Sequence, residues 1–215
     1  MPDQPMIVVR GEALREVPPE QAVLSVSVSS QGRDRDVVLA FLTERSAEVR
    51  ALIAEFGDAV ERRETGGVHI YPEFKRQGSE RRVTYAGSVG TTVTVIDFAV
   101  LGDLVSRLAS IKQAGISGPW WQLRPGSKAG AEVRREAIGE ALTRAREYAA
   151  AVGARVDRLV EIADEGSSGF TNLGFRSAAF KGEQQDSALE LDPQVQTVQA
   201  TVIVRVTITE PDLGD

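Results

Sequence analysis

The chain lacks cysteine and has a single histidine, His69, among its 215 residues. Without thiols it has no disulfide, no thiolate nucleophile and no cysteine-ligated zinc site. One histidine excludes metal sites built from several imidazoles and argues against a Ser-His-Asp triad. We therefore expect no catalytic, cofactor-binding or metal-binding residues, and we do not expect an enzyme.

Excess positive charge and long apolar runs are lacking too. The chain has 25 Lys and Arg against 31 Asp and Glu, and its net charge of −6 argues against a nucleic-acid partner. No run approaches the roughly 18 apolar residues that a membrane span needs. Residues 1–10 show no basic segment followed by a long apolar one, so we expect no signal peptide and a cytoplasmic location.

The clearest positive signal is the alternation in residues 197–209. One parity is apolar and the other is polar except for Ile203. Because successive side chains of a strand point to opposite faces, the segment is predicted to be one long strand with a buried and a wet side. Such alternation is typical of an antiparallel sheet covered on one face. The apolar parity consists of Val198, Ala200, Val202, Val204, Val206 and Ile208.

Periodicity elsewhere predicts hairpins interleaved with helices. We expect strands at 6–9, 21–30, 68–74, 83–96, 116–124, 155–163 and 197–209, and helices at about 36–56, 98–111 and 127–152. The order is β-β-α-β-β-α-β-α-β-β. It predicts an α+β fold, an antiparallel or mixed sheet with helices on one face, built from elaborated ferredoxin-like units. We expect one domain over residues 1–215 with its core at about 6–209.

Residues 165–192 have no periodicity and are rich in Gly, Ser, Gln and Asp. The segment is predicted to be a mobile loop. Its phenylalanines, Phe170, Phe175 and Phe180, recur at five-residue spacing, so the alternative is an arm that docks these rings on a neighbouring subunit.

Short motifs along almost the whole chain resemble the SIMPL-domain family, which includes periplasmic immunogenic and oxidative-stress-defence proteins of bacteria. The motifs that carry the resemblance are Ile7-Val8-Val9-Arg10-Gly11-Glu12, Pro19-Glu20-Gln21-Ala22, Thr84-Tyr85-Ala86, Leu101-Gly102, Ala114-Gly115, the Ala-rich segment 136–153 and the strand 194–208. Glu20 and Thr84 stand where the family pattern has Asp and Gly.

The resemblance implies an α+β fold, self-assembly into ring-like or higher oligomers in some members, and an association with oxidative-stress tolerance. It implies no catalytic residues, because the matching positions are mostly Gly, Ala and apolar residues.

Two adjacent tryptophans lie in one predicted strand and therefore face opposite ways. Trp121 shares its parity with Leu123 and is assigned to the core, whereas Trp120 shares its parity with Gln122. A neighbouring helix or loop, a subunit interface or a small-ligand pocket would each cover Trp120.

His69, Tyr71 and Glu73 share one predicted strand face. Imidazole and carboxylate can exchange protons near neutral pH, but no motif supplies a nucleophile, an oxyanion site or a metal. We interpret these three residues as surface residues of a hairpin.

Together these patterns favour a non-enzymatic, self-assembling scaffold or binding protein that forms a homo-oligomer. The sequence leaves open whether it also binds a different protein. Edge strands that invite pairing between chains support this hypothesis. The alternative is a small-molecule or peptide-binding protein that uses Trp120 and the 165–192 flap. The interface or ligand residues predicted in either case are Trp120, Phe170, Phe175 and Phe180.

Overall fold

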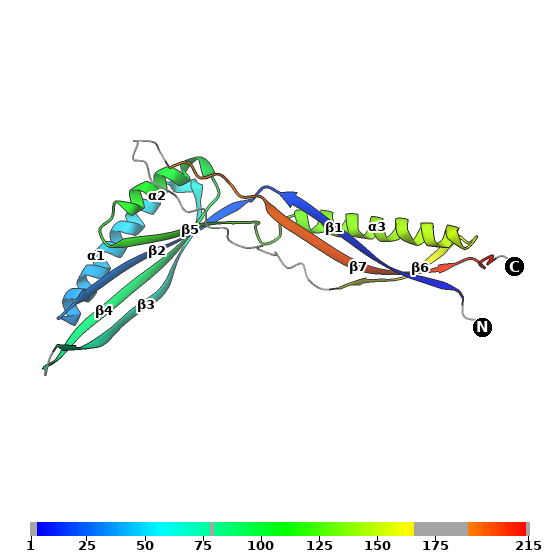
Figure 1. Cartoon of the computed structure of the whole chain (residues 1–215). Coiled ribbons are helices and arrows are strands. Elements are labelled where there is room, and N and C mark those ends of the chain that lie inside the picture. The colour runs from blue at the N-terminus through cyan, green and yellow to red at the C-terminus, as the bar shows by residue number, and fades with distance from the viewer. Residues whose placement is uncertain (1–3, 78–79, 166–188, 214–215) are drawn as a thin grey trace. The chain divides into compact units, whose positions relative to one another are not determined.

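The computed structural model describes residues 4–77, 80–165 and 189–213 (Figure 1). The elements of the described chain are β1 (Met6–Val17), β2 (Gln21–Gly32), α1 (Arg35–Ala54), β3 (Val60–Gln77), β4 (Glu80–Val95), α2 (Leu101–Ala109), β5 (Ala114–Gln122), α3 (Ala129–Ala151), β6 (Val156–Asp164) and β7 (Gln196–Ile208), with 3-10 turns at Gly57–Ala59 and Phe98–Val100. The α+β class and the predicted order of strands and helices are confirmed.

The strands divide between two antiparallel sheets, where the sequence predicted one. Their orders are β1-β7-β6 and β3-β4-β2-β5. Each sheet belongs to one compact unit: unit 1 is Met1–Pro18, Arg124–Ala178 and Val195–Asp215, and unit 2 is Pro19–Leu123 and Ala179–Gln194. Neither unit is one continuous segment, and the single domain over 1–215 stays a prediction.

Unit 2 has the ferredoxin-like topology. Its elements follow the order β2-α1-β3-β4-α2-β5. β4 lies between β2 and β3 and is antiparallel to both, so β2 and β3 run parallel and α1 connects them. This is the βαββαβ arrangement.

Helix α1 of unit 2 begins where the sequence supplies a cap, and both helices of this unit bury one apolar face. The Asp34 carboxylate accepts hydrogen bonds from Asp36 N at 2.8 Å and Val37 N at 3.4 Å, which satisfies free N–H groups at the start of α1. The core residues that α1, α2, β2 and β4 share are Val38, Leu42, Val49, Ile53, Leu101, Leu104, Leu108, Leu24, Val26, Val28, Val93 and Val95.

One charged contact joins α2 to the end of α1. Arg107 donates a hydrogen bond to the Glu55 carboxylate, and its guanidinium lies 5.3 Å from the centre of the Phe56 ring. The hydrogen bond to Glu55 raises the pKa of Arg107. Since arginine is cationic at physiological pH in any case, this contact adds no pH dependence there.

Unit 1 is a three-stranded sheet with α3 along one face (Figure 1). The buried residues of α3 recur at every fourth position, and four of the five are alanines: Val133, Ala137, Ala141, Ala145 and Ala149. They pack on the sheet face that carries the apolar parity of β7, which is buried as predicted. Small side chains let the helix approach the strands closely.

Gly11 in β1 marks the closest approach of α3 to the sheet. A Cβ atom added at Gly11 would lie 2.1 Å from the carbonyl oxygen of Ala137 and 2.7 Å from Cβ of Ala141. Position 11 therefore has no room for a side chain while α3 keeps its place.

The polar parity of β7 is less uniformly wet than the alternation predicted. Thr207 is buried, and its hydroxyl donates to the Asp157 carboxylate at 3.3 Å. Asp157 lies at a register shift of β6 against β7, between Val156 and Arg158. Bulges of this kind change which side chains cover a face, and alternation in one strand does not reveal a bulge in its neighbour.

We predict that Gly11→Ala destabilises the protein by about 1–3 kcal/mol, because the methyl group forces α3 away from β1. Gly139→Ala is the matched control. It lies in α3 with nothing within 4 Å of the added Cβ, and we expect it to stabilise by about 0.5–1 kcal/mol. Urea unfolding midpoints measure both. Equal midpoints for the two variants would contradict the close packing at Gly11.

Candidate functional site

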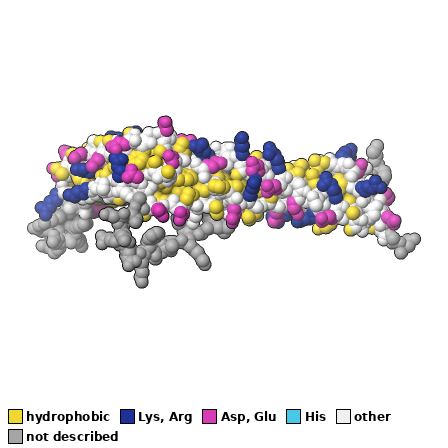
Figure 2. Space-filling model, turned by 90° about the horizontal axis from the view of Figure 1, so that it is seen from above, with side chains coloured by type: hydrophobic (Ala, Val, Ile, Leu, Met, Phe, Trp, Pro, Cys, Tyr) yellow, Lys and Arg dark blue, Asp and Glu magenta, His cyan; other side chains and the backbone are white. Residues whose placement is uncertain are grey.

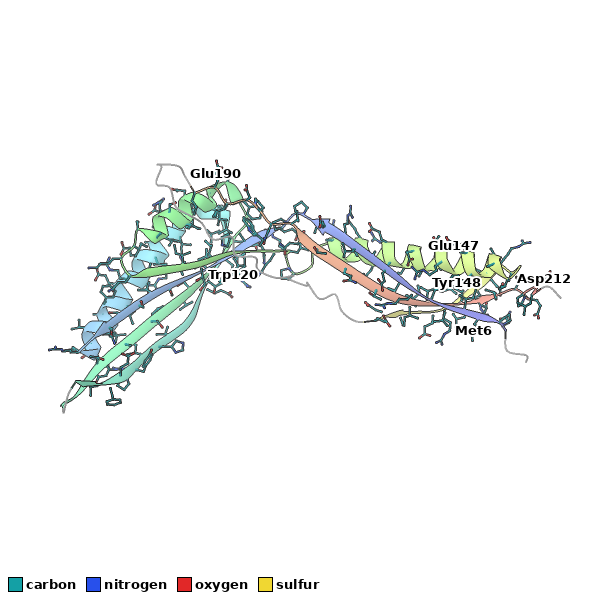
Figure 3. The ribbon with its side chains drawn as sticks, in the orientation of Figure 1. Met6, Trp120, Glu147, Tyr148, Glu190 and Asp212 are labelled. Atoms are coloured by element: carbon teal, nitrogen blue, oxygen red, sulfur yellow. The ribbon has the colours of Figure 1, made fainter. Side chains whose placement is uncertain are left out.

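The two tryptophans of β5 lie as their parity predicted. Trp121 pairs with Ala22 and is 8% exposed, and its ring meets that of Phe98 edge-on at a centroid distance of 4.9 Å and an interplanar angle of 82°. Trp120 pairs with Val23 on the opposite face of the sheet, away from the helices, and is half-buried (Figure 3).

The residues of this parity near Trp120 have mostly small side chains. Val23 separates Trp120 from Thr94, which is itself buried. Towards the other end of the face, Tyr71 on the edge strand β3 is 53% exposed. Between the two aromatic rings the residues of this parity in β2 and β4 are Ser25, Ser27, Ser29, Ser88, Gly90 and Thr92. Trp120 and Tyr71 are therefore two separate aromatic side chains on this face.

The three phenylalanines expected to act with Trp120 lie outside the described residues. Phe170, Phe175 and Phe180 all fall within 166–188. Their docking on Trp120 or on a second subunit stays a prediction.

His69, Tyr71 and Glu73 lie on β3 on the face that the sequence assigned them. His69 and Tyr71 are exposed, and Glu73 accepts a hydrogen bond from the side chain of Gln31 in β2. Within the described part of the chain, no group of three His, Asp or Glu side chains is placed to hold a metal ion. The contact with Gln31 gives Glu73 a structural partner.

A second surface, which the sequence reasoning missed, lies on unit 1. We call it the outer sheet face: the side of β1-β7-β6 opposite α3. The alternate residues Met6, Val8 and Leu14 of β1 point to it and are 55%, 54% and 62% exposed. Its signal in the sequence is the run of four apolar residues at 6–9, because a strand with apolar residues of both parities has apolar surface on both faces.

Ion pairs cross the outer sheet face between these apolar residues. Arg10 lies 3.0 Å from Glu12 and 3.2 Å from Glu165, and Arg205 on β7 lies 3.1 Å from Glu161 on β6. All five side chains are about half exposed, so each pair contributes roughly 0–1 kcal/mol. Together these two arginines and three glutamates leave a charge of only −1 on the face. Charges of both signs are interspersed in the same way over the surface shown in Figure 2.

Comparison with known proteins identifies the family of the chain. The model of the SIMPL family, described as a protein of unknown function (DUF541), matches residues 7–206. The chain belongs to the SIMPL family. The match spans both sheets and all three helices of the described structure.

Two relatives of this SIMPL protein are each named 26 kDa periplasmic immunogenic protein. The one from Brucella melitensis biotype 1 is 27% identical over 167 residues, and the one from Brucella abortus is 26% identical over the same length. The alignments cover 74% of this chain and 66% of each relative. Their names place those two proteins in the periplasm, which differs from the cytoplasmic location expected here.

A solved structure from Burkholderia cenocepacia, titled as a candidate amidohydrolase/peptidase, is 15% identical, with a TM-score of 0.27 over 64% of this chain and 36% of that chain. At that TM-score the likeness carries no argument. None of the described helices has the length and apolar character of a membrane span.

We predict that Trp121→Ser costs roughly 3–5 kcal/mol, a large part of a typical total stability of about 5–15 kcal/mol, because it removes a buried ring from the core. Trp120→Ser should cost about 1 kcal/mol or less, since Trp120 lies on the far face. Thermal unfolding followed by circular dichroism compares the two variants. Greater damage from Trp120→Ser would contradict the assignment of the two faces.

Proposed function

We propose that this SIMPL protein is a non-enzymatic, self-assembling scaffold or binding protein. The observation that carries the proposal is the outer sheet face, where Met6, Val8 and Leu14 expose more than half of their surface. Exposed apolar patches are typical of interaction surfaces, and these three side chains share one side of β1.

A second copy of the chain fits the outer sheet face. The five charges of its ion pairs sum to only −1, because two arginines face three carboxylates, so repulsion between two copies would be small. Two-fold pairing of identical patches is the commonest form of assembly among soluble proteins. Covering Met6, Val8 and Leu14 on both copies contributes roughly 4–8 kcal/mol, which reaches only the lower part of the cost of about 4–15 kcal/mol for association. The contact must therefore include much of the sheet face.

The absence of catalysis is part of the proposal. It is supported by the family motifs, whose positions here are mostly Gly, Ala and apolar residues, and by the contact between Glu73 and Gln31, which gives that carboxylate a structural role. A role in stress tolerance rests on the family resemblance.

The location of the protein is also a proposal. The two candidates are the cytoplasm, as predicted above, and the periplasm, which the names of the two relatives give for those proteins. Fractionation of the native cells distinguishes the two compartments.

Assembly is tested by native mass. We predict that wild type is a homo-oligomer and that Val8→Ser with Leu14→Ser lowers its mass, because the pair removes apolar contact area from the outer sheet face. Light scattering after size-exclusion chromatography measures the mass. The matched control is Val37→Ser with Leu39→Ser, which removes two exposed apolar side chains from α1 and should leave the mass unchanged.

Trp120→Ser added to this series tests the other surface. A fall in mass for Trp120→Ser, with none for the Val8 and Leu14 variant, moves the interface to unit 2. A monomeric wild type overturns the scaffold hypothesis, and a ligand-dependent melting shift in that monomer then supports the small-molecule or peptide-binding alternative.

A further inference from the structure

Four strands form the edges of the two described sheets: β1 and β6 in one, β3 and β5 in the other. The edge of a sheet presents free N–H and C=O groups that can pair with a strand of another chain. Native proteins commonly disrupt such edges with bulges and prolines, or cover them with another element.

Three of these described edge strands are irregular. β3 has two register shifts against β4 and contains Pro72. β5 has a register shift against β2 where Gly118 and Pro119 occur. β6 has two register shifts against β7. Each of these strands therefore carries a feature that weakens pairing with a further strand.

β1 is the regular one among these edge strands. It pairs with β7 through twelve successive residues, from Met6 opposite Thr207 to Val17 opposite Gln196, with no shift. It contains no proline. By geometry alone β1 is the described edge best suited to accept another strand.

Side chains of α3 occupy the outward backbone groups of β1. Glu12 N donates to Oε2 of Glu140 at 3.2 Å, and Nη1 of Arg144 donates to the carbonyl oxygen of Arg10 at 2.8 Å. Arg144 also binds the Glu140 carboxylate, four residues earlier on the helix. We call Glu140 and Arg144 the edge cap.

The two groups that the edge cap occupies are the ones that β1 would use to pair with itself. In an antiparallel pair of β1 strands centred on Gly11, Arg10 lies opposite Glu12 of the second copy, and the amide of that Glu12 donates to the carbonyl of Arg10. Both Arg10–Glu12 pairs then join opposite charges, and both Val8–Leu14 pairs join exposed apolar side chains on the outer sheet face. The sequence of β1 is thus complementary to itself in this register.

We infer that the β1 edge is a strand-pairing site for a second copy of this chain, and that Glu140 and Arg144 keep it closed. The partner is the β1 strand of that copy, antiparallel and centred on Gly11. Both cap side chains are about 40% exposed, so water can replace their hydrogen bonds when the cap opens. The inference does not rest on the proposed function, because its test compares the native mass of each variant with that of wild type.

The test removes the cap with Glu140→Ala and Arg144→Ala together. We expect an about twofold higher, concentration-dependent native mass by sedimentation velocity. The matched control, Arg146→Ala with Glu147→Ala, also removes one charge of each sign from exposed positions of α3 and should keep the wild-type mass. Glu140→Gln keeps an oxygen acceptor for the Glu12 amide and should also keep it.

A third substitution separates edge pairing from unfolding. Adding Glu12→Pro to the uncapped variant removes the outward N–H of residue 12, which is not part of the ladder with β7, so the mass should return to that of wild type. A mass that stays high with Glu12→Pro overturns the inference, as does an uncapped variant with native circular dichroism and unchanged mass. If circular dichroism shows that the uncapped variant has lost helix content, the native masses of the single variants Glu140→Ala and Arg144→Ala are measured instead and judged in the same way.

Discussion

The close packing of α3 on β1 and β7 is the constraint on which unit 1 depends. Alanine at four of the five buried positions of α3 and the missing side chain at Gly11 let the helix lie against the strands. This distance places Glu140 and Arg144 within hydrogen-bonding reach of the β1 backbone. A bulkier stripe would lift the helix and uncover the edge. Among the described elements, the same one-sided packing leaves no helix on the outer sheet face.

The outer face of β1 is exposed, whereas part of its backbone edge is covered. Its outer side chains are exposed and partly apolar, whereas its outward backbone groups at Arg10 and Glu12 are occupied by α3. The edge and the outer sheet face could each pair with a second copy by two-fold symmetry, and the use of both together would link copies into larger assemblies. A protein that assembles through the outer sheet face gains from a closed edge, since a closed edge restricts association to one geometry.

Much of the fold was predictable because local periodicity dictates it. The alternation in β7, the order of elements and the opposite faces of Trp120 and Trp121 follow from which neighbours a residue has in the chain. The predictions were incomplete where a feature depends on the pairing of one strand with another. Thr207 is buried and bonds to Asp157, which lies at a shift in the register of β6, and the strands divide into two sheets. The outer sheet face had a signal at residues 6–9, but one strand does not reveal whether a helix covers it.

The sequence by itself determined the order of the strands and helices, the parities of β5 and β7 and the absence of thiol chemistry, because these depend on residue type and local spacing. Only the tertiary structure decided which strands are edges, which edges are irregular, and that Glu140 meets Glu12, 128 positions away. The physical reason is that strand pairing and helix packing join residues far apart in the chain. Whether a backbone group or an apolar side chain is covered depends on those distant partners.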